Sequence, residues 1–167
     1  MPSFRCTGKL LKEIGVRKPE PIEHSNSDWH ANLLRFGPKK FVLFCSTDTL
    51  FACLTPPVSR AQIRDLDSIF FPALKAAMMA EGFSVDSIEY CTSKYRGMGI
   101  SKTYDKSVLG TMTDYLFHID SIFWHAGGFE GLDFGQVSAR LNDIPQVKRD
   151  WFNASDAFKK TLIRGVV

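Results

Sequence analysis

The sequence predicts an α+β fold in a single domain, residues 1–167, with antiparallel hairpin strands and about four helices. Three features support this class: apolar residues recur at helical spacing in several segments, β-forming runs flank a Gly-Pro turn, and no regular strand–helix alternation is present. Hydrophobic residues make up 44% of the chain and aromatic residues 13%. That composition is sufficient for a continuous core and excludes a disordered chain.

Short elements are predicted at the start of the chain. Residues 3–6 are expected to form a strand, and residues 9–14 a short helix that ends at Gly15. Residues 17–28 are rich in Pro, Ser and Asn, which is typical of a surface loop.

Two apolar runs follow, residues 29–36 and 41–45, on either side of Gly37-Pro38-Lys39-Lys40. Turn residues between β-forming runs predict a hairpin. The next run, residues 49–54, is compatible with either a strand or a helical turn, and it stops at Pro56-Pro57.

A capping box is predicted at Ser59 and Gln62, because a hydroxyl and an amide three residues apart can satisfy the first N–H groups of a helix. The helix that follows has apolar residues at helical spacing, namely Ile63, Leu66, Phe70, Leu74, Ala77 and Met78. Pro72 lies inside this pattern and is expected to kink or split the helix, since proline lacks the backbone N–H. Gly82 is expected to end it.

In the second half of the chain, residues 83–91 alternate loosely in polarity and are predicted as a strand. The clearest helix spans residues 108–126 and is closed by Gly127-Gly128; its apolar face comprises Val108, Met112, Tyr115, Ile119, Ile122 and Ala126. Residues 129–146 are expected to be irregular or to hold a short strand. A last helix is predicted to start with Asn153 as its N-cap.

Charge and cysteine content exclude some classes of protein. The net charge of +3 permits a local positive surface but does not by itself indicate a nucleic-acid-binding protein. No secretory signal or apolar run of ~20 residues is present, so we expect a soluble, cytoplasmic protein that does not act on a membrane. The four cysteines lack C-x-x-C spacing and are expected to be buried, reduced thiols: Cys6, Cys45, Cys53 and Cys91.

The strongest candidate site is a basic segment just before the helix at 108–126. Its cations and hydroxyls can bind phosphate, and its tyrosines can stack on the bases of a single strand. The candidate residues for anion or nucleic-acid binding are Lys94, Tyr95, Arg96, Lys102, Thr103, Tyr104, Lys106 and Ser107. The alternative is a solvated loop in which Thr103 or Asp105 only caps the helix. Neither a P-loop nor G-x-G-x-x-G is present, so no nucleotide fingerprint or cofactor is predicted.

Other residues carry weaker signals. Asp114, His118, Ser121 and His125 share one helix face, which can ligate a metal or hold an acid–base pair but is more typical of an exposed polar face. Because a third ligand is missing at recognised spacing, we predict no metal. A nucleophile could be sought among Cys91, Ser107 and Cys45, with His30, His118 or His125 as base, although buried thiols are the simpler interpretation. Trp29 is more typical of a core anchor than of a ligand platform.

Several motifs together resemble a family of small uncharacterised bacterial proteins. The resemblance rests on Cys6-Thr7-Gly8-Lys9-Leu10-Leu11, Asp28-Trp29-His30-Ala31-Asn32-Leu33-Leu34, Lys40-Phe41-Val42-Leu43-Phe44, Thr49-Leu50-Phe51, Ser101-Lys102-Thr103, Lys106-Ser107-Val108-Leu109-Gly110-Thr111-Met112-Thr113-Asp114 and Leu141-Asn142-Asp143-Ile144-Pro145. In that family we expect Arg, Ser and Asn where this sequence has Lys106, Thr111 and Thr113. The resemblance implies a single domain and no particular reaction.

The function predicted from the sequence is binding, with a partner protein or a nucleic acid as the ligand. Antitoxin, inhibitor or phage-defence roles agree with the size of the chain only. The alternative is a small enzyme acting on a phosphate-containing or nucleic-acid substrate, in which Lys102, Thr103, Lys106 and Ser107 hold the phosphate and a histidine acts as acid–base.

Overall fold

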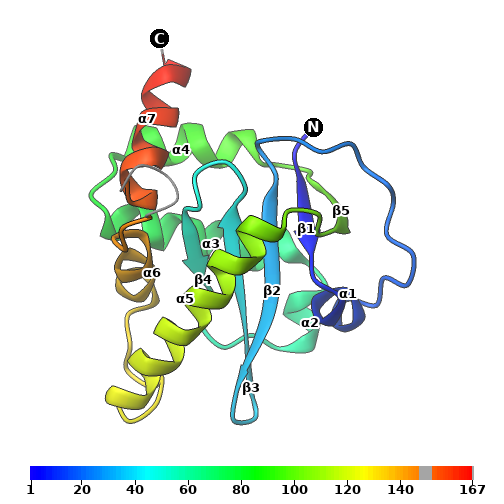
Figure 1. Ribbon diagram of the computed structural model, residues 1–167, viewed down its shortest axis with the longest axis vertical. Helices are drawn as coiled ribbons and strands as arrows, with labels where there is room; N and C mark the ends of the chain where they lie inside the picture. The colour runs from blue at the N-terminus through cyan, green and yellow to red at the C-terminus, as the bar shows by residue number, and fades with distance from the viewer. Residues whose placement is uncertain (147–151, 167) are drawn as a thin grey trace.

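A five-stranded mixed sheet forms the centre of the computed structural model, which describes residues 1–146 and 152–166, with side chains to residue 162 (Figure 1). The strand order is β4-β3-β2-β1-β5. β1 is parallel to both β2 and β5, whereas β3 is antiparallel to β2 and β4. The strands are β1 (Ser3–Cys6), β2 (Trp29–Phe36), β3 (Lys39–Ser46), β4 (Ala52–Leu54) and β5 (Gly99–Lys102).

The predicted α+β class is confirmed, but the helix count of about four is wrong. Within the described residues there are seven helices. They are α1 (Gly8–Ile14), α2 (Arg60–Ile63), α3 (Leu66–Ala80), α4 (Val85–Lys94), α5 (Lys106–His125), α6 (Phe134–Asn142) and α7 (Ala154–Val166). The antiparallel hairpin is present as β2 and β3, yet the sheet as a whole is mixed because β1 and β5 join it in parallel.

The hairpin turn is tighter than predicted. Phe36 pairs with Lys39, so only Gly37 and Pro38 connect the strands and β3 begins two residues early. Gly37 has φ of 59°, a left-handed conformation that glycine adopts without a steric penalty.

Two segments that we predicted as strand or irregular are helices. Residues 85–94 form α4, and the Ser84 side chain accepts a hydrogen bond from the backbone N–H of Ser87 at its start. Residues 134–142 form α6, which Asp133 caps in the same way through the N–H of Gln136. In both segments the buried face is too short to show a clear helical period in the sequence. The capping residues Ser84 and Asp133 are therefore the better sequence signal for a helix.

Pro72 neither splits nor ends α3. The helix runs through it from Leu66 to Ala80, and the break lies earlier, between α2 and α3 at Arg64 and Asp65. Pro72 and Ser68, whose carbonyl loses its N–H partner, are both exposed, so water can satisfy that oxygen. The predicted capping box at Ser59 and Gln62 is confirmed.

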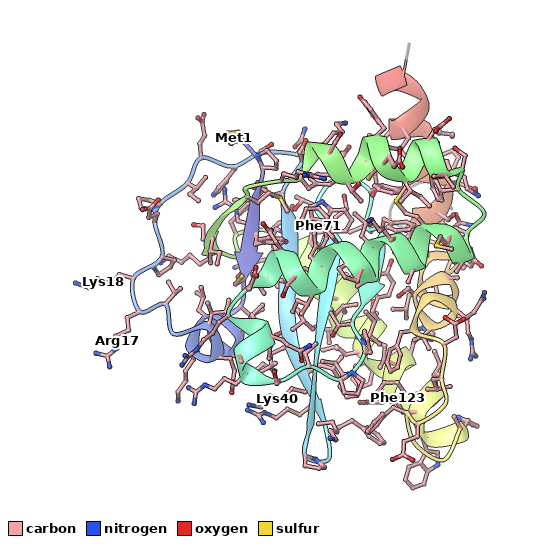
Figure 2. All side chains as sticks on the ribbon, turned by 180° about the vertical axis from the view of Figure 1, so that it is seen from behind. Met1, Arg17, Lys18, Lys40, Phe71 and Phe123 are labelled. Atoms are coloured by element: carbon pink, nitrogen blue, oxygen red, sulfur yellow. The ribbon has the colours of Figure 1, made fainter. Side chains whose placement is uncertain are left out.

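Helices cover the sheet on opposite faces. Phe70 of α3 contacts Phe4 and Phe44, with ring centroids 5.1 Å and 4.9 Å apart. Phe123 of α5 contacts Phe41, at 5.3 Å. Phe41 and Phe44 are three residues apart on β3 and therefore point to opposite faces of the strand. Accordingly, α5 crosses the sheet in Figure 1, while α3 and α4 lie in front of it when the molecule is seen from behind in Figure 2.

Candidate binding cleft along helix α5

The basic segment does not form one surface. Arg96 follows α4 and lines a hollow with Asp67, Phe71 and Lys75 of α3, on one side of the sheet. Lys106 begins α5 on the other side. The cations that are neighbours in sequence are therefore divided between two faces of the molecule.

Tyr95 lies in the core. Its ring is 5.6 Å from that of Trp29 and 6.2 Å from that of Phe70, measured between centroids. Burial raises the pKa of the Tyr95 hydroxyl to about 12. Trp29 is itself fully buried, as expected for a core anchor.

Tyr104 is held by other side chains of the protein. Its hydroxyl lies 3.2 Å from the Asp28 carboxylate and 3.2 Å from the Ser25 carbonyl oxygen, either of which can accept its proton. Its ring stacks on His24 at 3.6 Å, and the Arg5 guanidinium lies 4.9 Å from the ring centroid. The ring thus already has an aromatic and a cationic neighbour within the protein.

The start of α5 is capped by the chain itself. The Asp105 carboxylate accepts hydrogen bonds from the backbone N–H groups of Ser107 and Val108, at 2.9 Å and 3.1 Å. This agrees with the alternative interpretation of the sequence, in which Asp105 caps the helix. Two of the N–H groups that a ligand could bind at this helix end are therefore already satisfied, so recognition there depends largely on side chains.

Such side chains line a cleft of about 570 Å³ between the first half of α5 and residues 144–146. The cleft brings together two candidate groups that the sequence kept separate: Lys106 and Ser107 from the basic segment, and Asp114 and His118 from the polar helix face. Lys102 and Thr103 are not among its lining residues. The other lining residues are Gly110, Thr111, Tyr115, Phe117, Ile144, Pro145 and Gln146.

Most polar side chains in the cleft have no partner within the described residues. Neither Lys106, Ser107, Thr111, Asp114 nor His118 makes a side-chain hydrogen bond or ion pair there. Thr111 stands out because it is half-buried. A threonine in a helix can bond back to the carbonyl four residues earlier, as Thr113 on the same helix does to Leu109 at 3.0 Å.

One wall of the cleft is fixed by hydrogen bonds. The buried Tyr115 hydroxyl donates to the Leu50 carbonyl at 3.0 Å, and the Gln146 side-chain amide donates to the same hydroxyl at 3.2 Å. These bonds connect α5 to the segment opposite it. Thr111 and Gln146 were not among the site residues predicted from the sequence. A signal for Thr111 is present, because Ser107, Thr111, Asp114 and His118 follow each other at helical spacings of four and three.

The geometry does not support a serine nucleophile activated by His118. Ser107 and His118 are eleven residues apart on one helix, which corresponds to about 16 Å along its axis. A nucleophile and its base must be within about 3 Å of each other. The remaining helix histidine, His125, contacts the Ser121 carbonyl through Nδ1 at 2.7 Å.

The other nucleophile candidates are buried. Burial raises the pKa of the Cys91 thiol to about 12, which suppresses its thiolate at neutral pH. His30 is fully buried and burial lowers its pKa to about 4. Its Nε2 accepts from the Asp105 N–H at 3.4 Å, so Nδ1 carries the proton and donates to the Thr47 hydroxyl, 2.8 Å away. Among the residues whose placement is described, no group of three His, Cys, Asp or Glu side chains is arranged to hold a metal ion.

The outer face of α5 also exposes two large aromatic side chains. Phe117 and Trp124 are 70% and 80% exposed. They are seven residues apart and so lie on the same side of the helix, two turns from each other. Beside Trp124 is an apolar hollow of about 310 Å³, lined by Phe36, Phe123, Gly127 and Gly128.

Sequence comparison defines the class of protein to which this α+β chain belongs. Residues 3–157 match the family described as Domain of unknown function (DUF6933), and the chain is therefore a member of that family. Neither curated proteins nor solved structures give a significant match. No helix in the described part of the chain is both long and apolar enough to cross a bilayer.

Proposed function

We propose that this protein is a binding protein that engages a partner protein through the outer face of α5. The observation that carries this proposal is the exposure of Trp124, at 80%, next to the apolar hollow formed with Phe36 and Phe123. Tryptophan is enriched among the residues that dominate binding energy at interfaces. The hollow beside it can accept an apolar side chain of the partner.

Phe117 extends this surface by two helical turns. Paired exposed aromatic residues on one helix are costly in a monomer, because large apolar surface is favourably removed from water. A partner that covers both rings would bury apolar area without rearranging the fold. Rigid helices need little reorganisation on binding, which lowers the entropic cost.

A nucleic acid is the second candidate ligand, and Lys106 in the cleft, which has no side-chain partner among the described residues, is the observation that favours it. The enzyme alternative receives less support. It requires Lys102, Thr103, Lys106 and Ser107 to hold one phosphate beside a histidine, whereas Lys102 and Thr103 do not line the cleft and about 16 Å of helix separates Ser107 from His118. Binding without chemistry is therefore the function that agrees best with the geometry.

Site-specific photo-crosslinking tests the proposal. A photo-reactive residue replaces Trp124 in one variant and Met79 in another, and each is crosslinked in cells of the source organism. Met79 is a matched control because it is 68% exposed but lies on α3, on the other side of the sheet. We expect a specific crosslinked protein from position 124 only.

The captured partner is then purified and its affinity measured by calorimetry. Trp124→Ser should weaken binding by tenfold or more, since central aromatic anchors contribute about 2 kcal/mol or more. Met79→Ser should change it by less than about twofold. Equal effects of the two substitutions, or no crosslink at position 124, would refute the α5 surface.

A further inference from the structure

We infer that the cleft along α5 is a binding site for a nucleoside monophosphate group that carries an exocyclic amino group. This inference rests on other observations than the proposed protein-binding surface, with which the cleft shares Phe117. It rests on polar side chains that line one cleft and have no partner in the part of the chain that the structure describes, with the cation at the start of the helix and the carboxylate two turns further on. It also rests on a wall that is already held in place by Tyr115 and Gln146.

The end of the cleft at Lys106 and Ser107 fits the phosphate. Lys106 supplies a positive charge, and the hydroxyls of Ser107 and Thr111 supply donors four residues apart on the same side of the helix. A charged donor together with hydroxyl groups is a common way to bind a phosphate. The half-buried Thr111 hydroxyl has no other partner among the described residues.

The other end fits a hydrogen-bond donor. The Asp114 carboxylate accepts hydrogen bonds only, so it favours an amino group over a carbonyl oxygen. Lys106 and Asp114 are eight residues apart, or about 12 Å along the helix. A ligand that reaches both must be elongated and must carry opposite polarity at its two ends, as adenosine or cytidine monophosphate does.

The cleft also has apolar surface against which a base or sugar can pack. Ile144 and Pro145 line it from the segment opposite α5, and Phe117 lines it from the helix. The volume of about 570 Å³ is within the range of about 300–1,000 Å³ that is usual for small-ligand sites.

The test measures binding of AMP, IMP, adenosine and inorganic phosphate to the full chain by calorimetry and by NMR chemical shifts. AMP and IMP differ in that IMP has a carbonyl oxygen in place of the amino group. We expect AMP to bind at least fivefold more tightly than IMP, and adenosine and phosphate to bind more weakly than AMP. Shifts should centre on residues 106–118.

Two substitutions in the cleft separate the two ends of the site. Lys106→Met should weaken AMP and IMP alike, by about tenfold. Asp114→Asn should remove the preference for AMP, because an amide can donate to the carbonyl of IMP as well as accept. Thr113→Ala is a matched control on the same helix but outside the cleft, and it should leave both affinities within about twofold.

Absence of AMP binding at millimolar concentration, or binding that is unchanged by Lys106→Met and Asp114→Asn, would overturn the inference. Trp124→Ser should not affect AMP, so failure of this site is distinguishable from failure of the protein-binding surface. An oligonucleotide with a 5′-phosphorylated terminal adenosine presents the same group. Competition with AMP by this oligonucleotide would assign the site to nucleic-acid ends, and its absence would assign it to the free nucleotide.

Discussion

Arg5 and Asp28 form a buried ion pair in which the arginine Nε lies 2.9 Å from the carboxylate Oδ2, with side chains only 2% and 0% exposed. Asp28 also accepts hydrogen bonds from the backbone N–H and hydroxyl of Ser3 and from the N–H of Ser25. Burial raises the pKa of the Asp28 carboxyl, but the backbone N–H groups of Ser25 and Ser3 and the Arg5 guanidinium outweigh it and hold that pKa below its usual range. The Tyr104 hydroxyl lies 3.2 Å from the same carboxylate. One carboxylate thus joins β1, the 17–28 loop and the segment that leads into α5.

We predict that Arg5→Met lowers the free energy of unfolding by about 3–5 kcal/mol, because it leaves the Asp28 charge buried without its cation. Urea unfolding followed by circular dichroism measures the change. Arg35→Met is a matched control: Arg35 also lies 2.9 Å from a carboxylate, that of Glu13, but is 53% exposed. Its loss should cost less than about 1 kcal/mol. Similar losses for the two variants would contradict the assigned role of the buried pair.

His30 should make the fold sensitive to mild acid. Its pKa is about 4 in the folded chain and near 6.5 when unfolded, so the unfolded chain binds a proton more readily between these values. The free energy of unfolding is therefore expected to fall as the pH decreases from 6.5 to 4, by about 3 kcal/mol in total. Protonation of the Asp28 carboxyl lowers the free energy of unfolding only at still lower pH, because the pKa of this carboxyl in the folded chain is below its ordinary value.

The control for this prediction is His30→Gln, because a glutamine side chain cannot take up the proton that gives histidine its positive charge. Urea unfolding at pH 7 and pH 4.5 should show a smaller difference for this variant than for the wild type. An equal pH dependence in both proteins would exclude His30 as the source.

The elements that could be predicted from the sequence are those with strong local signals. The apolar face of α5 repeats over five turns, so its helix was identified to within two residues at its start and one at its end. The Ser59–Gln62 capping box and the Gly-Pro turn are likewise fixed by neighbouring residues. Short helices such as α4 and α6 present too few buried positions to show a period.

The candidate site depended on tertiary structure and could be predicted only in part. Lys106 and His118 were identified separately, but their joint cleft exists only because residues 144–146 pack opposite α5. Tyr95 and Tyr104 are both tyrosines in a basic segment. The residues next to them in the sequence do not show that Tyr95 lies in the core whereas Tyr104 is held by hydrogen bonds. Burial of this kind is decided by contacts with Trp29 and Asp28, far away in the sequence.

The four thiols should be unreactive in the native protein. All four cysteines are buried thiols outside any disulfide, and burial raises the pKa of Cys6 and Cys91 to about 12. We expect negligible labelling by iodoacetamide at pH 7.5 and four adducts after unfolding in guanidinium, measured by intact mass. Rapid native labelling of any cysteine, or a stable disulfide in the purified protein, would contradict the assigned core.

The divided basic segment gives a prediction for nucleic-acid binding. Lys94 and Arg96 lie at the end of α4, on the side of the sheet away from Lys106, so one bound strand should not contact both groups. Contacts of Lys102 and Lys106 would neutralise two phosphates at most. We therefore expect a single-stranded oligonucleotide to bind with a log–log salt slope of no more than about 1.4.

Fluorescence anisotropy across a salt series distinguishes the two groups of cations. The variant Lys102→Glu with Lys106→Glu should abolish binding, whereas Lys94→Glu with Arg96→Glu should leave it within about twofold. Both double variants should keep the melting temperature of the wild type, because these side chains are exposed and substitutions at such positions change stability by about 0.5 kcal/mol or less. A log–log salt slope above about 3, with loss of binding in both variants, would show one continuous basic surface. It would contradict the division of the cations between two sides of the sheet. Absence of binding by the wild type even at low salt would exclude nucleic acid and leave a partner protein as the ligand.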